Sequence, residues 1–285
     1  MTTSSSNMQA SGIPTVGLST AVTITEKCIR SHLVPFIKGS PGVGKSAIIK
    51  QLATTFQLEI IDLRLSQCDP TDLQGFPVTS NGRSDFAPPA YIPLEGKDEL
   101  PKDKAGWLLF LDEFNSADRS VQRAAYKLVL DRQIGVHNVH PNVAIVCAGN
   151  LDTDNAITEE LSSALQSRLV HLTTHVDVEE WLAWARSSGI DNRISSFIAF
   201  KPDLLHKFNP DSIDTTFPCP RTWEFAHKYL KNTGQLQAHD RTALAGIIGK
   251  GASVELDAFL DVHTSLPTMR DILKNPTTLP IPEEP

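Results

Sequence analysis

Two uninterrupted apolar runs constrain the fold of this 285-residue chain more than any other feature of its sequence. They are Trp107–Asp112 (WLLFLD) and Asn142–Ala148 (NVAIVCA), and neither shows the apolar and polar alternation of a strand with one face in water. Such runs are typical of strands that are buried on both faces. We therefore expect both to lie centrally in a sheet that helices cover on its two sides.

The rest of the first 176 residues alternates short apolar runs with helical stretches, which is typical of an α/β fold with a mostly parallel sheet. After Val176 the pattern predicts successive helices and no strand. Further strands are expected at Val34–Lys38, Leu58–Leu65 and Leu169–Thr173, and helices at Lys45–Phe56, Ser120–Leu130 and Glu159–Gln166. The expected organisation is a disordered tail (1–12), an α/β domain (13–176), a small helical lid domain (177–270) and a proline-rich acidic tail (271–285).

A glycine-rich motif lies between an expected strand and an expected helix. The segment GSPGVGKS fits the pattern G-x-x-x-x-G-K-[ST] at every fixed position. Glycines let the backbone turn its N–H groups toward phosphate oxygens, and the start of the following helix adds a positive dipole end. We expect ATP to bind at Gly39, Ser40, Pro41, Gly42, Val43, Gly44, Lys45, Ser46 and Ala47. Lys45 would reach the β- and γ-phosphates, and the Ser46 hydroxyl would bind Mg²⁺.

Two carboxylates stand at the end of the first apolar run. Because ligands of such sheets bind at the carboxyl ends of the strands, Asp112 and Glu113 are expected beside the phosphates. Asp112 would hold Mg²⁺, and Glu113 would polarise the water that attacks the γ-phosphate. The sequence therefore predicts hydrolysis of ATP in addition to its binding.

Two more polar residues have open interpretations. Asn150 follows the second apolar run, where its amide could orient the attacking water or contact the γ-phosphate, or simply open a turn. Arg168 follows an expected helix, where a cation commonly compensates the helix dipole. The residues alone do not decide between these roles.

Composition limits the remaining function classes. The net charge of −7 and the pI of about 5.7 disfavour a surface built mainly for nucleic acid. The four cysteines are widely spaced, which indicates reduced thiols, and no segment is long and apolar enough to span a membrane. We expect a cytoplasmic protein.

With these motifs in order, the chain resembles AAA+ ATPases of the MoxR group, close to their dynein-related or midasin-like branch. The resemblance covers about residues 30–230, and its motifs are GSPGVGKS, DLRLSQCDPTDLQGFP, LFLDEFNSA, VCAGN, ALQSRL and PRTWEF. It implies that Asn150 is the first sensor, Arg168 the arginine finger for a neighbouring subunit's nucleotide, and Arg221 the second sensor. Arg119, Arg123 and Arg132 remain alternative subunit-facing arginines.

The resemblance also implies an assembly and an output. A homo-oligomeric ring, hexameric in this family, would remodel a protein partner, often with a protein that carries a von Willebrand factor A domain. The segment from Gln67 to Pro93 would form a hairpin-bearing insertion near the pore, although a solvated connecting loop is an equal alternative. A nucleic-acid motor and a nucleotide-switched scaffold with little turnover are the competing functions.

Overall fold

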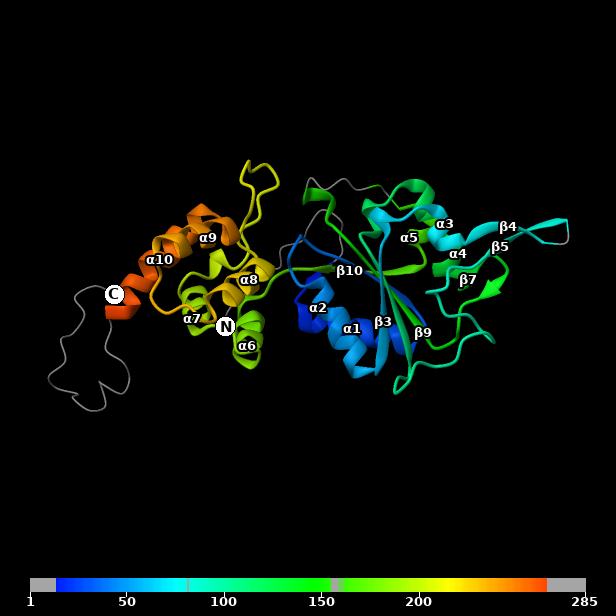
Figure 1. The fold of residues 1–285 in the computed structure, drawn as a ribbon, viewed down its shortest axis with the longest axis horizontal. Coiled ribbons are helices and arrows are strands. Elements are labelled where there is room, and N and C mark those ends of the chain that lie inside the picture. Colours follow the sequence, from blue (N-terminus) through cyan, green and yellow to red (C-terminus); the bar gives the residue numbers. More distant parts are fainter. Residues whose placement is uncertain (1–13, 81, 155–158, 160, 266–285) are drawn as a thin grey trace. The chain divides into compact units, whose positions relative to one another are not determined.

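Residues 14–80, 82–154, 159 and 161–265 are described by a computed structural model, and the chain divides into two units (Figure 1). The first unit comprises residues 1–180 with 209–212, and the second comprises residues 181–208 with 213–285. The tails expected at 1–12 and 271–285 lie outside the described residues. Among the described residues, no helix combines the length and apolar character needed to cross a bilayer.

The first unit is built on a six-stranded sheet in which every neighbouring pair is parallel. The strand order is β1-β10-β2-β9-β6-β3. The strands are β1 (Thr15–Val16), β2 (Val34–Lys38), β3 (Leu58–Arg64), β6 (Gly106–Asp112), β9 (Val143–Gly149) and β10 (Leu169–Thr174). The two apolar runs are β6 and β9, which lie side by side in the interior of the sheet, so the predicted α/β fold is confirmed.

The two faces of the sheet explain why β6 and β9 lack alternation. Leu108 and Phe110 pack on one face with α1 (Leu18–Arg30) and α2 (Lys45–Thr55). Leu109 and Leu111 pack on the other face, against α4 (Arg119–Asp131). Since each face is covered, neighbouring residues along these strands are both buried.

Two helices differ from expectation. Helix α1 was not predicted, because its β-branched residues favour strand more than helix, yet its buried face packs on the sheet. The helix expected at Glu159–Gln166 was wrong in its start, since α5 covers only Ser163–Gln166. Ser162 caps α5 through its hydroxyl, and the Glu159 amide instead donates to the Asn115 carbonyl.

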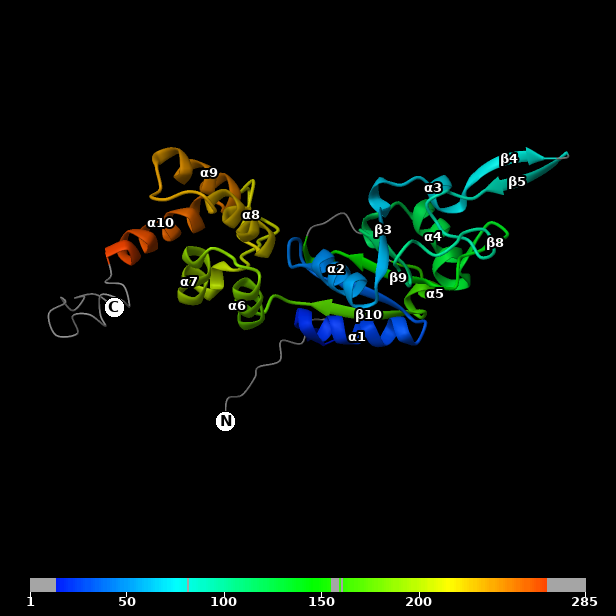
Figure 2. The ribbon, with the colours of Figure 1, turned by 60° about the horizontal axis from the view of Figure 1, so that its bottom comes forward.

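The expected hairpin insertion is present. After the short helix α3 (Pro70–Gln74), strands β4 (Phe76–Ser80) and β5 (Arg83–Ala87) pair antiparallel, and Gly82 has the positive φ of a tight turn. Figures 1 and 2 both show this hairpin projecting from the first unit. A second short hairpin joins β7 (Gln133–Ile134) to β8 (His137–Asn138), and Gly135 at its turn has a positive φ.

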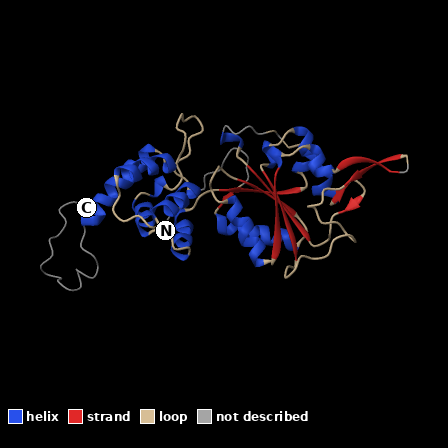
Figure 3. Cartoon of the chain, viewed as in Figure 1, coloured by secondary structure: helices blue, strands red, loops and turns tan. Residues whose placement is uncertain are grey.

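The second unit contains helices and loops in its described part (Figure 3). Its helices are α6 (Val178–Ser187), whose first residues belong to the first unit, α7 (Asn192–Phe200), α8 (Pro220–Leu230), α9 (Ala238–Ile248) and α10 (Lys250–Ser265). Trp223 is fully buried at its centre, and its indole N–H donates to the Leu204 carbonyl at 2.9 Å.

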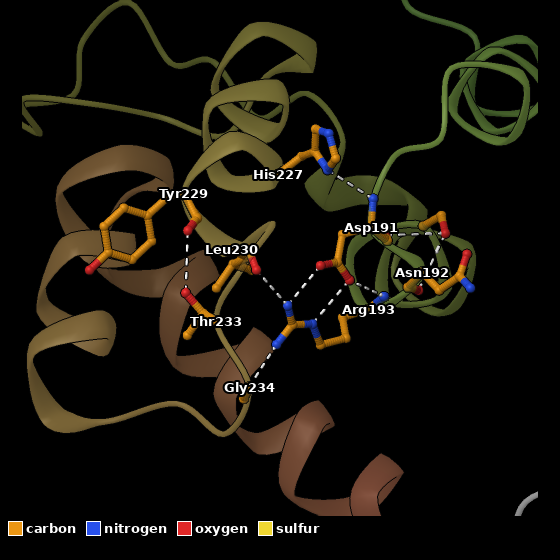
Figure 4. Close-up of polar contacts among 9 residues, drawn as sticks. Asp191, Asn192, Arg193, His227, Tyr229, Leu230, Thr233 and Gly234 are labelled. Carbon is orange, nitrogen blue, oxygen red and sulfur yellow. Dashed lines mark hydrogen bonds and ion pairs between the residues drawn. The ribbon is translucent and has the colours of Figure 1, made fainter.

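Arg193 of α7 forms a bidentate ion pair with Asp191 and also contacts the end of α8 (Figure 4). The Arg193 guanidinium contacts both carboxylate oxygens of Asp191, at 3.0 and 2.7 Å. It also donates to the carbonyls of Leu230 and Gly234, both at 2.9 Å, and so satisfies backbone acceptors where α8 ends. Arg193 holds the pKa of the Asp191 carboxyl below its usual range despite partial burial.

Candidate nucleotide-binding and active site

The parallel sheet brings the predicted site residues to one edge. Strand β9 pairs with β2 on one side and with β6 on the other. Gly149 of β9 lies opposite Lys38 of β2, and Cys147 of β9 lies opposite Leu111 of β6. The glycine-rich loop, the two carboxylates and Asn150 each follow the carboxyl end of one of these strands. Sequence positions more than 100 residues apart, such as Lys45 and Asn150, therefore meet.

The loop from Gly39 to Ser46 has the backbone that an anion cradle requires. A Cβ on Gly39 would lie 2.4 Å from Thr174 Oγ1, so no larger residue fits between β2 and β10. Gly44 has φ 112°, which disfavours any side chain, and no side chain caps the α2 N-terminus there. Ser46 and Ala47 are exposed in the first turn. The positive dipole end and the N–H groups of that helix start suit a phosphate.

Lys45 and Asn150 are in direct contact. The Lys45 ammonium donates to Asn150 Oδ1 at 3.3 Å and to the carbonyls of Gly39 and Ser40 in its own loop. The predicted phosphate-binding lysine and the predicted sensor amide therefore share one site. An ammonium and an amide that converge in this way can contact the same terminal phosphate.

A buried residue that the sequence analysis did not assign holds Asn150 in place. The Asn115 amide nitrogen donates to the Asn150 carbonyl at 2.9 Å, and its oxygen accepts from the Asn150 N–H at 3.0 Å. The Asn150 side chain also donates to Ser116 Oγ at 3.4 Å. Asn115 is 3% exposed, and its two hydrogen bonds to Asn150 make it a positioning residue. Its place in the motif LFLDEFNSA is the only feature of the sequence that could have indicated this role.

Replacing Asn115 with Ala should uncouple Asn150 from the site. The change leaves a buried N–H and a carbonyl without partners, which costs about 1–3 kcal/mol in the free energy of unfolding. Misplacement of a group near the reacting atoms lowers turnover by up to about 100-fold. Urea unfolding and steady-state ATP turnover measure the two effects, with the exposed Asn192→Ala as control. Unchanged turnover in a destabilised Asn115→Ala chain would refute the positioning role.

The two carboxylates differ in environment. Burial raises the pKa of the Asp112 carboxyl, although the Glu113 amide, which donates to it at 2.8 Å, and the nearby Lys45 charge act in the opposite direction. Glu113 has φ 55°, a left-handed conformation that few non-glycine residues adopt, at the turn after β6. Ser66 donates its hydroxyl to the Glu113 carboxylate. Ser66 is a second site residue that the sequence analysis missed.

The oxygen atoms of the side chains at this edge of the sheet suit a nucleotide with bound Mg²⁺. Asp112 supplies a carboxylate next to Lys45, and Ser46 supplies a hydroxyl in the first turn of α2. Hard oxygen ligands of this kind, completed by phosphate oxygens and water, are those that Mg²⁺ prefers. The loop and α2 supply the N–H groups for the phosphates. The residues present therefore fit both ATP and its metal.

Arg168 is not part of this edge. It precedes β10, whose first residue pairs with Val34 at the amino end of β2. Thr174, at the other end of β10, donates to the Lys38 carbonyl just before the glycine-rich loop. From Arg168 to Thr174 the chain spans about 20 Å at ~3.3 Å per residue. The exposed Arg168 guanidinium donates to the Tyr126 hydroxyl at 2.9 Å. An arginine side chain cannot cross that distance to the nucleotide of its own chain.

The other arginines considered for this role are held differently. Arg119 forms an ion pair with Glu159 at 2.7 Å, and Arg123 is exposed on α4. Arg132 is directed inward, donating to the carbonyls of Val143 and His140. Arg221 lies exposed in the first turn of α8 in the second unit. Within the first unit, the structure thus brings together Lys45, Asp112, Glu113 and Asn150, whereas Arg168 lies at the opposite end of β10.

One family model matches the part of the chain that carries this site. Residues 35–169 match the AAA domain, dynein-related subfamily. No curated protein matches the sequence. A structure of a candidate ATPase from Cytophaga hutchinsonii has 21% identity and a TM-score of 0.45, over 62% of this chain and 52% of that chain. A mutant of Thermotoga maritima RuvB has 18% identity and a TM-score of 0.49, over 92% and 77%.

The matched residues contain the glycine-rich loop, both carboxylates, Asn150 and Arg168. The chain spans about half the length of the Cytophaga protein. Its parallel sheet, its phosphate-type loop at the start of α2 and its acidic strand end agree with the family match. Residues 35–169 therefore match the AAA domain of the dynein-related subfamily and carry the glycine-rich loop and the acidic strand end of a nucleotide site.

Proposed function

We propose that this chain is a Mg²⁺-dependent AAA+ ATPase of MoxR type, which works as a ring and remodels a protein partner. The observation that carries the proposal is the position of Arg168. It is exposed and lies about 20 Å along β10 from the edge that holds Lys45 and Asn150. If it acts in hydrolysis, it must act on the nucleotide of another subunit, which requires assembly.

Each residue at the carboxyl edge has a role in the proposal. Lys45 neutralises charge on the β- and γ-phosphates, and backbone N–H groups of the glycine-rich loop and of the first turn of α2 bind them. Glu113 accepts a proton from the attacking water, and Asn150 orients that water. Ser46 and Asp112 would hold Mg²⁺, which supplies positive charge against the charge that develops in phosphoryl transfer.

The proposal assigns two domains, an α/β nucleotide-binding domain at 13–176 and a helical lid at 177–270. Arg221 on the lid would read the nucleotide state as second sensor. Because loss of the γ-phosphate removes several contacts together, hydrolysis would change the lid and subunit orientations. The hairpin β4–β5 exposes Phe76 by 67% and Val78 by 41%, and such apolar side chains suit transient contact with a remodelled protein. A von Willebrand factor A domain protein is the proposed partner class.

The dependence of turnover on assembly tests this proposal. ATP turnover per subunit should rise with protein concentration and reach a plateau where light scattering reports a homo-oligomer. Turnover should rise because each nucleotide site lacks Arg168 of a neighbouring subunit until that subunit binds. A constant turnover per subunit across the transition from monomer to oligomer would rule out the shared active site.

A further inference from the structure

The sheet of the first unit has an open edge at β3. This strand is the last in the order and pairs only with β6. Among the described residues, no backbone hydrogen bond joins its outer side to another strand. Ile60 in the middle of β3 is 38% exposed. An edge of this kind presents alternate N–H and carbonyl groups that can pair with a further strand.

A cleft of about 410 Å³ lies beside this edge. Its walls come from β3, from β6 and from the segment that leads from the hairpin β4–β5 back toward β6. The lining includes Glu59, Ile60, Tyr91, Asp98, Glu99 and Trp107. It contains three carboxylates and, among the described residues, no lysine or arginine. The cleft therefore combines acidic side chains with apolar and aromatic ones.

The aromatic walls are held in place, and two of the carboxylates are accessible. The Tyr91 hydroxyl donates to the Asp72 carbonyl, and burial, with the Asp72 charge, raises the pKa of Tyr91 to about 12. The Trp107 ring packs edge-on against His140 at 5.0 Å. Asp98 accepts from the Leu94 amide at 2.8 Å, whereas the side chains of Glu59 and Glu99 have no described hydrogen bond or ion pair, and both residues are exposed.

We propose that β3 and this cleft form a docking site for an extended segment of a partner protein, whose backbone pairs with β3 while a lysine or arginine side chain enters the cleft. Addition of a strand to an open edge supplies affinity through the backbone, and the neighbouring pocket supplies specificity for a side chain. Charge complementarity selects the cation, because carboxylates and aromatic faces both attract one.

The docking site is separate from the nucleotide site. Glu59 lies near the amino end of β3, and Arg64 ends the strand at the edge that carries the nucleotide site. These two residues are about 16 Å apart along the strand at ~3.3 Å per residue. Substitutions at Glu59 or Glu99 should therefore leave basal ATP turnover unchanged, which separates this inference from the proposed function.

Fluorescence anisotropy with a labelled nonapeptide of alternating threonine and valine, with arginine at its centre, tests the docking site on the full chain. The peptide should bind, and Glu59→Gln and Glu99→Gln should each weaken binding about tenfold, as expected for loss of a charge-assisted contact. The control Glu179→Gln, an exposed carboxylate on α6, should bind like the wild type. A peptide with central glutamate should bind at least about tenfold more weakly.

Two further peptides, N-methylated on one or the other alternate set of residues, test strand pairing. Only one set of amides can face β3, so one methylated peptide should lose binding and the other should keep it. Equal binding of both methylated peptides would overturn the pairing with β3. Absence of binding by the unmodified peptide, or equal losses in Glu179→Gln and Glu59→Gln, would overturn the docking site as a whole.

Discussion

Glu113→Gln should bind ATP with wild-type affinity and hydrolyse it about 10²–10⁴-fold more slowly. The substitution keeps the size of the side chain and its ability to accept the hydrogen bond from Ser66. It removes the carboxylate that takes the proton from the attacking water. Binding of a fluorescent ATP analogue and release of phosphate separate the two effects.

Glu179→Gln is the matched control, because Glu179 is an exposed glutamate of the same unit outside the site. It should show wild-type binding and turnover. If Glu113→Gln retained turnover within about threefold of the wild type, far inside the expected loss, another group would have to activate the water.

Arg168→Ala should lower turnover by about 10³-fold or more while ATP still binds, as expected for loss of an arginine that stabilises the transferring phosphoryl group. The distance between Arg168 and the nucleotide site of its own chain requires that the effect act across subunits. Loss of the hydrogen bond to Tyr126 alone predicts no such change in rate. Steady-state turnover of the assembled variant measures the effect.

Mixing two inactive variants tests the action across subunits directly. A subunit with Arg168→Ala retains Glu113, and a neighbouring subunit with Glu113→Gln retains Arg168. An intact site therefore forms where the second presents its arginine to the first, and the mixture should regain turnover that neither variant has. Tyr126→Phe, which removes only the hydroxyl that Arg168 contacts, is the control and should stay active. A mixture that stays inactive despite co-assembly would exclude Arg168 as the shared arginine.

The central part of the fold and site was predictable because it rests on local patterns. Continuous apolar runs predict doubly buried strands, and β6 and β9 are the interior strands they indicated. The glycine-rich loop marks the start of α2, because Gly44 with φ 112° is outside the helical region and directly precedes Lys45. Since parallel strands end at one edge, the positions of Asp112 and Asn150 followed from the strand ends alone.

The remaining features depend on contacts between distant segments. Asn115 contacts Asn150 through two hydrogen bonds, and Ser66 contacts Glu113, but neither pair has a spacing that a single sequence reveals. Helix α1 forms because tertiary packing overrides the propensity of its β-branched residues. The start of α5 reflects the local cap by Ser162, and the bond from the Glu159 amide to the Asn115 carbonyl joins segments that are distant in the sequence.

The most direct test of the central claim is steady-state ATP turnover of the assembled wild-type chain with Mg²⁺, measured beside Lys45→Ala. Turnover by the wild type should saturate with ATP and depend on Mg²⁺. Lys45→Ala should lose both turnover and nucleotide binding. The reason is that the Lys45 ammonium lies where the glycine-rich loop and Asn150 converge. Turnover by Lys45→Ala at the wild-type rate, or no turnover by a wild-type assembly that binds ATP, would contradict the central claim.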